Sequence, residues 1–68
     1  MTYEQALKWV DSLRVLIKAT RKRGYYVAVN QRMGAPGEWS VIVTHWKGAY
    51  SRDWSLRTPA ECQAWRPE

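Results

Sequence analysis

The chain has 68 residues, which we expect to form one domain, residues 1–68, with a thin core that depends on five Trp and four Tyr rings. Its single Cys excludes an intrachain disulfide. One Cys with one His does not make the usual ligand set of a zinc site, so we expect no metal and no other cofactor. Eleven Lys and Arg against six Asp and Glu give a net charge of +5, which favours a polyanionic partner such as nucleic acid, an anionic membrane or an acidic protein surface.

Residues 2 to about 20 have the pattern of an amphipathic helix. Thr2 and Gln5 have the spacing of a capping box, in which each side chain satisfies an amide of the first turn. Apolar side chains then recur at steps of three and four: Tyr3, Ala6, Leu7, Val10, Leu13 and Ile17. Gly24 is the expected helix stop, because glycine adopts the left-handed conformation without steric strain.

This first segment carries charges where a signal peptide needs an unbroken apolar run, and no stretch reaches the ~20 apolar residues of a membrane span. The apolar face of the helix is needed for the core, so we do not expect it to bind a membrane. With one unpaired Cys, a cytoplasmic location is the simplest expectation.

Three strands are predicted after the helix, over residues of about 25–31, 39–46 and 49–56. The segments "YYVAVNQ", "WSVIVTHW" and "AYSRDWSL" have the β-branched and aromatic content of strands. The segment "MGAPGE" between the first two strands is a loop marked by glycine and proline.

Lys47 and Gly48 are predicted to be the two turn residues of a hairpin, which places Trp46 opposite Ala49. Alternation along the strands then sorts the side chains onto two faces. The face predicted to contact the helices carries Val27, Val29, Trp39, Val41, Val43, His45, Tyr50, Arg52, Trp54 and Leu56. The opposite face, here named the open face, carries Tyr26, Ala28, Asn30, Arg32, Ser40, Ile42, Thr44, Trp46, Ala49, Ser51, Asp53 and Ser55.

Arg52 is out of place on the apolar face. An inward-pointing charge on an edge strand discourages pairing between sheets and would explain this position. A β-bulge near Arg52 would explain it equally well, and the sequence does not choose between the two.

A short second helix is predicted over residues 59–65. Thr58 is its N-cap and Glu61 completes a capping box, while Cys62 and Trp65 are spaced to face the core. The predicted fold is therefore α+β in the order α-β-β-β-α, a three-stranded antiparallel sheet with both helices on one face.

Double-stranded RNA-binding domains have the same order of elements. That family places a lysine-rich cluster, aimed at phosphates, at the start of its second helix. The corresponding stretch here is "RTPAECQ", with one arginine before the cap and a glutamate inside the helix. Only the order of elements agrees, so membership of the family is not inferred.

No catalytic arrangement is visible in the sequence. His45 lies in a strand on the predicted core face, Cys62 lies in an apolar helical turn, and the six acidic residues are scattered. The "GAPG" loop lacks the spacing of a phosphate-binding loop. We therefore expect a small binding module and not an enzyme.

Basic residues gather where the first helix is predicted to meet the first strand, in a stretch without acidic residues. Lys18, Arg21, Lys22 and Arg23 are here named the basic joint, and Arg32 follows in the same stretch. Cations near a helix C-terminus interact with its dipole by ~0.3–1 kcal/mol each, which accounts for Lys18 and one or two of the others but does not require all four. Two interpretations remain open: a solvated helix end, or a knuckle beside the loop between the first two strands that contacts phosphates or an acidic partner.

Tyr26 and Trp46 are the aromatic residues predicted to point outward from the open face. Exposed rings on a sheet can stack on unpaired bases, as in common RNA-binding modules. They can equally be covered by a partner protein or by a second copy of the chain in a homodimer.

The leading functional hypothesis is nucleic-acid binding through the basic joint, largely without sequence preference. The alternative is a protein-interaction module that binds an acidic surface of a larger complex. Such a module could block a host complex, as phage or mobile-element inhibitors of defence systems do.

Overall fold

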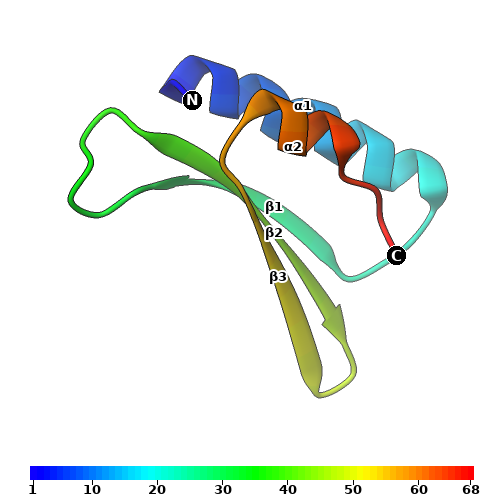
Figure 1. The fold of residues 1–68 in the computed structure, drawn as a ribbon. Coiled ribbons are helices and arrows are strands. Elements are labelled where there is room, and N and C mark those ends of the chain that lie inside the picture. The colour runs from blue at the N-terminus through cyan, green and yellow to red at the C-terminus, as the bar shows by residue number, and fades with distance from the viewer.

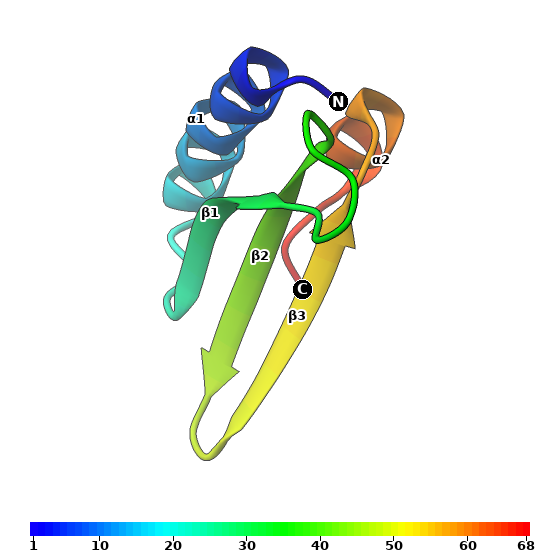
Figure 2. The same cartoon turned by 90° about the vertical axis from the view of Figure 1, so that its left-hand side faces the viewer.

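The computed structural model describes all 68 residues and confirms the predicted α+β fold. Its elements are α1 (Tyr3–Thr20), β1 (Tyr25–Gln31), β2 (Trp39–Lys47), β3 (Tyr50–Leu56) and α2 (Pro59–Ala64). The strands form one antiparallel sheet in the order β1-β2-β3. Both helices cover the same face of this sheet (Figure 1), and β2 runs between the two edge strands (Figure 2). Neither helix has the length and apolar character needed to cross a membrane.

The start of α1 follows the predicted capping box. The Thr2 hydroxyl accepts a hydrogen bond from the Gln5 amide at 3.2 Å, and the Gln5 side chain accepts one from the Thr2 amide at 2.9 Å. The buried stripe of the helix is narrower than predicted, because Tyr3 and Leu7 lie at its exposed margin. Its buried residues are Ala6, Val10, Leu13 and Ile17.

The expected helix stop at Gly24 is wrong, because α1 ends three residues earlier. Arg21 takes the left-handed conformation, with φ of 57°, and its amide donates a hydrogen bond to the Lys18 carbonyl at 3.1 Å. Gly24 is required for a different reason. Its φ is +86°, and a Cβ at this position would lie 2.5 Å from the carbonyl oxygen of Trp46. The chain thus passes close against β2 before β1 begins, and only glycine leaves room for that approach.

The hairpin between β2 and β3 is shifted by two residues from its predicted register. Lys47 pairs with Tyr50, so the turn residues are Gly48 and Ala49. Gly48 has a φ of +63° and Ala49 has no positive φ, the pattern of a type II′ turn with glycine first. A turn made of Lys47 and Gly48 would be of type I′ and would require a positive φ at Lys47 as well. Because the shift is an even number of residues, the predicted assignment of side chains to the two faces still holds.

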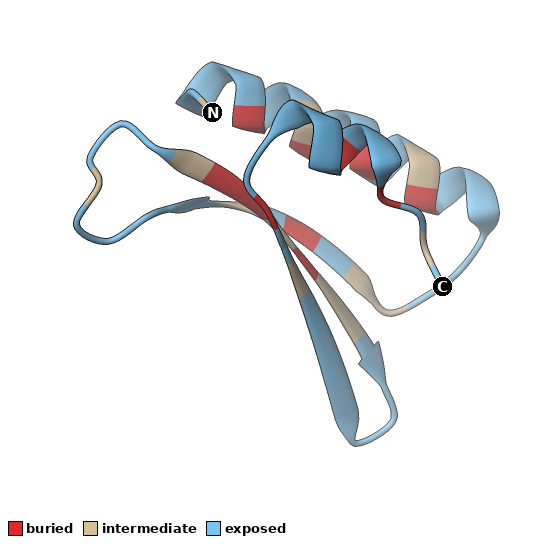
Figure 3. Cartoon of the chain, viewed as in Figure 1, coloured by how far each residue is buried: buried red, intermediate tan, exposed pale blue.

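The core lies between the helices and the part of the sheet beneath them (Figure 3). Its ten buried residues are Ala6, Val10, Leu13, Ile17, Val27, Val41, Val43, Leu56, Cys62 and Trp65. Trp54, predicted to be central, is half-buried and packs edge-on against Trp65 with ring centroids 5.5 Å apart. His45 is also half-buried, with the Tyr25 ring stacked on it at 4.0 Å.

The pairing of β2 with β3 is continuous, so the bulge considered for Arg52 is absent. Arg52 lies opposite His45 on the helix-facing side of edge strand β3. Its side chain is 62% exposed, forms an ion pair with Glu68 and has its guanidinium carbon 4.9 Å from the centre of the Trp54 ring. The charge is therefore satisfied at the rim of the sheet and does not enter the core.

Candidate nucleic-acid interface

The basic joint occupies the turn between α1 and β1. Lys18 lies in the last helical turn, Arg21 is the C-cap, and Lys22 and Arg23 lead into β1. All four residues are exposed. The two ion pairs of the chain, Arg32–Glu38 and Arg52–Glu68, involve none of them. Lys18, Arg21 and Arg23 therefore present their charges to solvent without a partner, whereas Lys22 contacts Glu68.

The C-terminal segment folds back against this end of the molecule. The Glu68 amide donates a hydrogen bond to the Tyr25 hydroxyl at 2.8 Å, and the Lys22 ammonium donates one to the Glu68 main-chain oxygen. The Glu68 carboxylate pairs with Arg52. Arg52 is thus a further cation at this end, and sequence reasoning did not assign it to the site. Its misfit on the predicted apolar face was the signal that could have found it.

Tyr26 and Trp46 point outward from the open face at the same end of the sheet as the joint. Their exposed fractions are 63% and 53%. Tyr26 lies opposite Thr44, so Trp46 is its diagonal neighbour across the strands, within reach of a large aromatic side chain. The Trp46 amide also donates a hydrogen bond to the Gly24 carbonyl at 2.8 Å, which ties this residue to the end of the joint.

Arg32 is not brought to the basic joint. It follows the far end of β1, where its side chain pairs with Glu38 at 3.4 Å. The strand between has seven residues, and a strand rises ~3.3 Å per residue, so on the order of 20 Å separates them. The expectation that the joint lies beside the loop between β1 and β2 is therefore wrong, since loop and joint lie at opposite ends of β1 (Figure 1).

The hairpin of β2 and β3 extends beyond the helices, and its far end is exposed (Figure 3). Tyr50 lies on the helix-facing side of the sheet, as predicted, but neither helix reaches it and it is 81% exposed. Together with Trp46 it gives the end of the hairpin two exposed rings. Sequence reasoning missed Tyr50 because alternation assigns a face to a residue but does not say how far the covering helix extends.

The side chains that could take part in catalysis or bind a metal ion lie apart from one another. Cys62 is buried, and that burial, followed by the negative charge of Glu61, raises the pKa of its thiol above the ordinary value. At neutral pH the thiol is therefore protonated and is a poor nucleophile. No three His, Cys, Asp or Glu side chains are grouped so that they could hold a metal ion.

No protein-family model, curated protein or solved structure matches this chain.

Proposed function

We propose that this domain binds nucleic acid through the basic joint, without sequence preference and without catalysing a reaction. The observation that carries the proposal is the absence of any carboxylate partner for the exposed Lys18, Arg21 and Arg23. Binding to phosphates releases condensed counterions, so a cluster of free cations gives affinity for any sequence.

The exposed rings of the open face favour single-stranded nucleic acid as the ligand. Tyr26 and Trp46 lie beside the joint, so a strand whose phosphates contact the joint can place its bases against these rings. Stacking on aromatic rings is worth ~1–3 kcal/mol per base and tolerates every base. Asp53 is the one acidic strand residue on this face. It lies opposite Thr44 on the edge strand β3, so it is a diagonal neighbour of Trp46 on the side away from β1.

Changing Arg21, Lys22 and Arg23 together to Ala is expected to weaken nucleic-acid binding and to flatten its dependence on salt. Each lost phosphate contact removes ~0.9 from the slope of log K against log salt on duplex, or ~0.7 on a single strand. Fluorescence anisotropy across a salt series measures both effects. A matched control compares two single substitutions, Arg23→Ala in the joint and Lys8→Ala outside it. Lys8 is an exposed cation of α1, and Lys8→Ala is expected to leave the salt slope unchanged.

Two outcomes separate this proposal from its competitors. If Tyr26→Ala and Trp46→Ala weaken single-strand binding and spare duplex binding, the open face stacks bases. If the wild-type protein binds no DNA or RNA at low salt, the joint is only a solvated helix end and the proposal fails.

The exposed end of the hairpin favours one second candidate, a module that binds an acidic surface of a larger protein complex. Trp and Tyr dominate the energetics of protein interfaces, and Trp46 and Tyr50 are both exposed there. Capture of a protein that survives nuclease treatment and is lost in Trp46→Ala would support this candidate. Capture that disappears with nuclease would support nucleic acid.

A further inference from the structure

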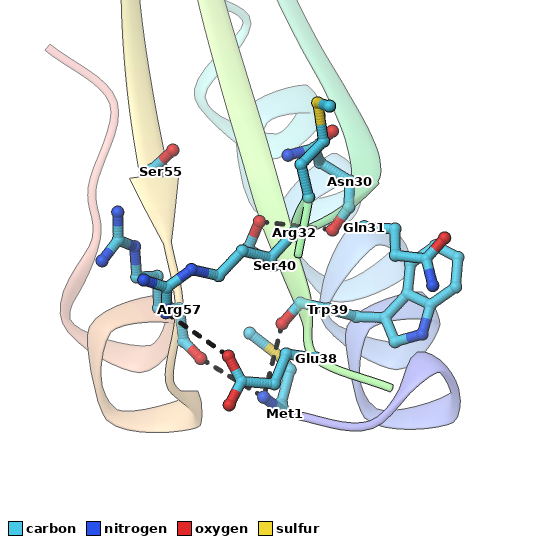
Figure 4. A pocket seen from close by; sticks show the side chains of 10 residues that line it. Met1, Asn30, Gln31, Arg32, Glu38, Trp39, Ser40, Ser55 and Arg57 are labelled. Carbon is cyan, nitrogen blue, oxygen red and sulfur yellow. Dashed lines mark hydrogen bonds and ion pairs between the residues drawn. The ribbon is translucent and has the colours of Figure 1, made fainter. Parts of the chain in front are cut away.

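The open face ends in a pocket on the side away from the basic joint. The pocket lies between the β1–β2 loop and the end of β3 and has a volume of about 440 Å³ (Figure 4). Sites for small molecules occupy ~300–1,000 Å³, so this pocket has room for a nucleotide-sized ligand. Neither the basic joint nor the exposed aromatic residues contribute to its lining.

Two arginines lie on one side of this pocket. The side chain of Arg32 runs across β2 towards Arg57, which follows β3 (Figure 4). Glu38 is the one carboxylate in the pocket lining, and it lies 3.4 Å from Arg32 with both side chains more than half exposed. An exposed pair of this kind is weak. The Arg57 guanidinium has no hydrogen-bond or ion-pair partner, so the lining side chains carry one positive charge in excess, and the Met1 ammonium adds a second.

The other residues that line the pocket suit an anionic ligand that carries an organic group. Ser40 is 8% exposed, and its hydroxyl makes only a long hydrogen bond of 3.4 Å to the Asn30 carbonyl. Ser40 lines the same pocket as Arg32 and Arg57, so its hydroxyl can contact the same oxyanion as their guanidinium groups, which match the geometry of phosphate. Met1 and the 95% exposed Met33 supply the apolar side chains of the lining, since the Trp39 ring packs against Tyr3 of α1 on the helix-facing side.

We propose that this pocket binds a phosphomonoester of nucleotide size. The phosphate lies between Arg32 and Arg57 and is contacted by the Ser40 hydroxyl, and the organic part lies against Met1 and Met33. The site does not depend on the proposed function of the basic joint, since the two share no residue and lie at opposite ends of β1. The same phosphate group can come from a free nucleotide or from the phosphorylated end of a strand.

Titration of the ¹⁵N-labelled protein with adenosine monophosphate tests the site. We expect shifts at the Ser40 and Arg57 amides, and no such shifts with adenosine at the same concentration. Arg57→Gln removes a charge-assisted contact and is expected to weaken binding about tenfold. Glu38→Gln removes the competing carboxylate and is expected to strengthen binding several-fold. Arg23→Gln, which alters the joint, is expected to leave nucleotide binding unchanged.

Equal shifts with adenosine, or unchanged affinity in Arg57→Gln, would overturn the proposal. Arg57 is exposed, so this variant is expected to melt with the wild type, and its melting curve verifies that the fold is intact. A second arm compares an oligonucleotide that carries a 5′-phosphate with the same strand without it. A preference for the phosphorylated strand that is lost in Arg57→Gln assigns the pocket to strand ends. Equal binding of both strands, with nucleotide binding retained, assigns it to free nucleotides.

Discussion

At the scale of single residues, Arg21 combines backbone strain with a place in the proposed binding site. It is the one residue other than glycine with a positive φ, and it caps α1 in the middle of the basic joint. A left-handed conformation is unfavourable for a residue with a Cβ, and glycine is the usual residue at such a helix end. The chain thus retains a cation at a position where glycine would be more stable.

We therefore expect Arg21→Gly to raise the free energy of unfolding by ~0.5–1 kcal/mol, through relief of that strain. Urea denaturation measures the change. Arg21→Ala is the control, since it removes the same charge and keeps the Cβ, and it is expected to bring no gain. Both variants are expected to lose nucleic-acid affinity. A fall in the stability of Arg21→Gly would contradict this account of the cap.

Cys62 is a second single residue with a testable effect, because its thiol makes the free energy of unfolding depend on pH. Burial, followed by the charge of Glu61, raises the pKa of its thiol, so the folded state holds the thiol proton more tightly than the unfolded state does. The resulting stability is complete below the unfolded-state pKa of ~8.5 and is lost as the pH rises through the folded-state pKa.

Above pH ~8.5 the free energy of unfolding of the wild type is expected to fall more steeply than that of Cys62→Ala. Urea denaturation at a series of pH values measures the difference. Parallel curves for the two proteins would show that the thiol does not contribute. Because Cys62 is buried away from the joint, Cys62→Ala is also expected to keep nucleic-acid binding.

At the scale of elements, α1 holds the domain together through a narrow stripe. Leu13 is 2% exposed, whereas Leu7 on the same helix is 40% exposed. Removing a buried Leu side chain costs ~2–5 kcal/mol, which is most of the stability expected for a domain this small. Leu13→Ala is therefore expected to be unfolded or close to it, and Leu7→Ala to melt much nearer to the wild type.

Thermal denaturation followed by circular dichroism compares the two variants directly. They differ in burial alone, since the residue type, the substitution and the helix are the same. A midpoint for Leu13→Ala within about two degrees of the wild type would show that the assigned core face is wrong.

At the scale of the whole molecule, Glu68 links the basic joint and the start of β1 to β3, which is remote from both in sequence. It contacts Lys22 after α1, Tyr25 of β1 and Arg52 of β3. Its carboxylate neutralises a cation close to the basic joint. An anionic partner that binds this end of the molecule would therefore have to displace the C-terminal segment.

Glu68→Gln is expected to strengthen nucleic-acid binding and to steepen its salt dependence by up to ~0.7–0.9, the slope of one further phosphate contact. The ion pair with Arg52 is exposed and contributes only ~0–1 kcal/mol to stability. The melting midpoint is therefore expected to change little. Anisotropy titrations over a salt series test this, and an affinity equal to that of the wild type would show that Glu68 does not compete.

The sequence by itself determined the elements and their faces. The three-and-four spacing of α1, the alternation of the strands and the caps at Thr2 and Thr58 all involve neighbours within a few residues. Such patterns act locally and can be interpreted without knowing the fold. The assignment of Tyr26 and Trp46 to the open face held for the same reason, even though the hairpin register was shifted, because alternation depends only on parity.

The tertiary structure alone decided how residues remote in sequence meet. The length of β1 separates Arg32 from the basic joint, and the course of the C-terminal segment brings Glu68 to Arg52. The hairpin register placed Arg52 opposite His45, at the rim beyond the helices. Strands β1 and β3 end at the same end of the sheet, and this places Arg32 and Arg57, which follow them, in one pocket. Each of these contacts depends on where an element ends and on which strand lies beside it. A local pattern of residue types contains neither piece of information.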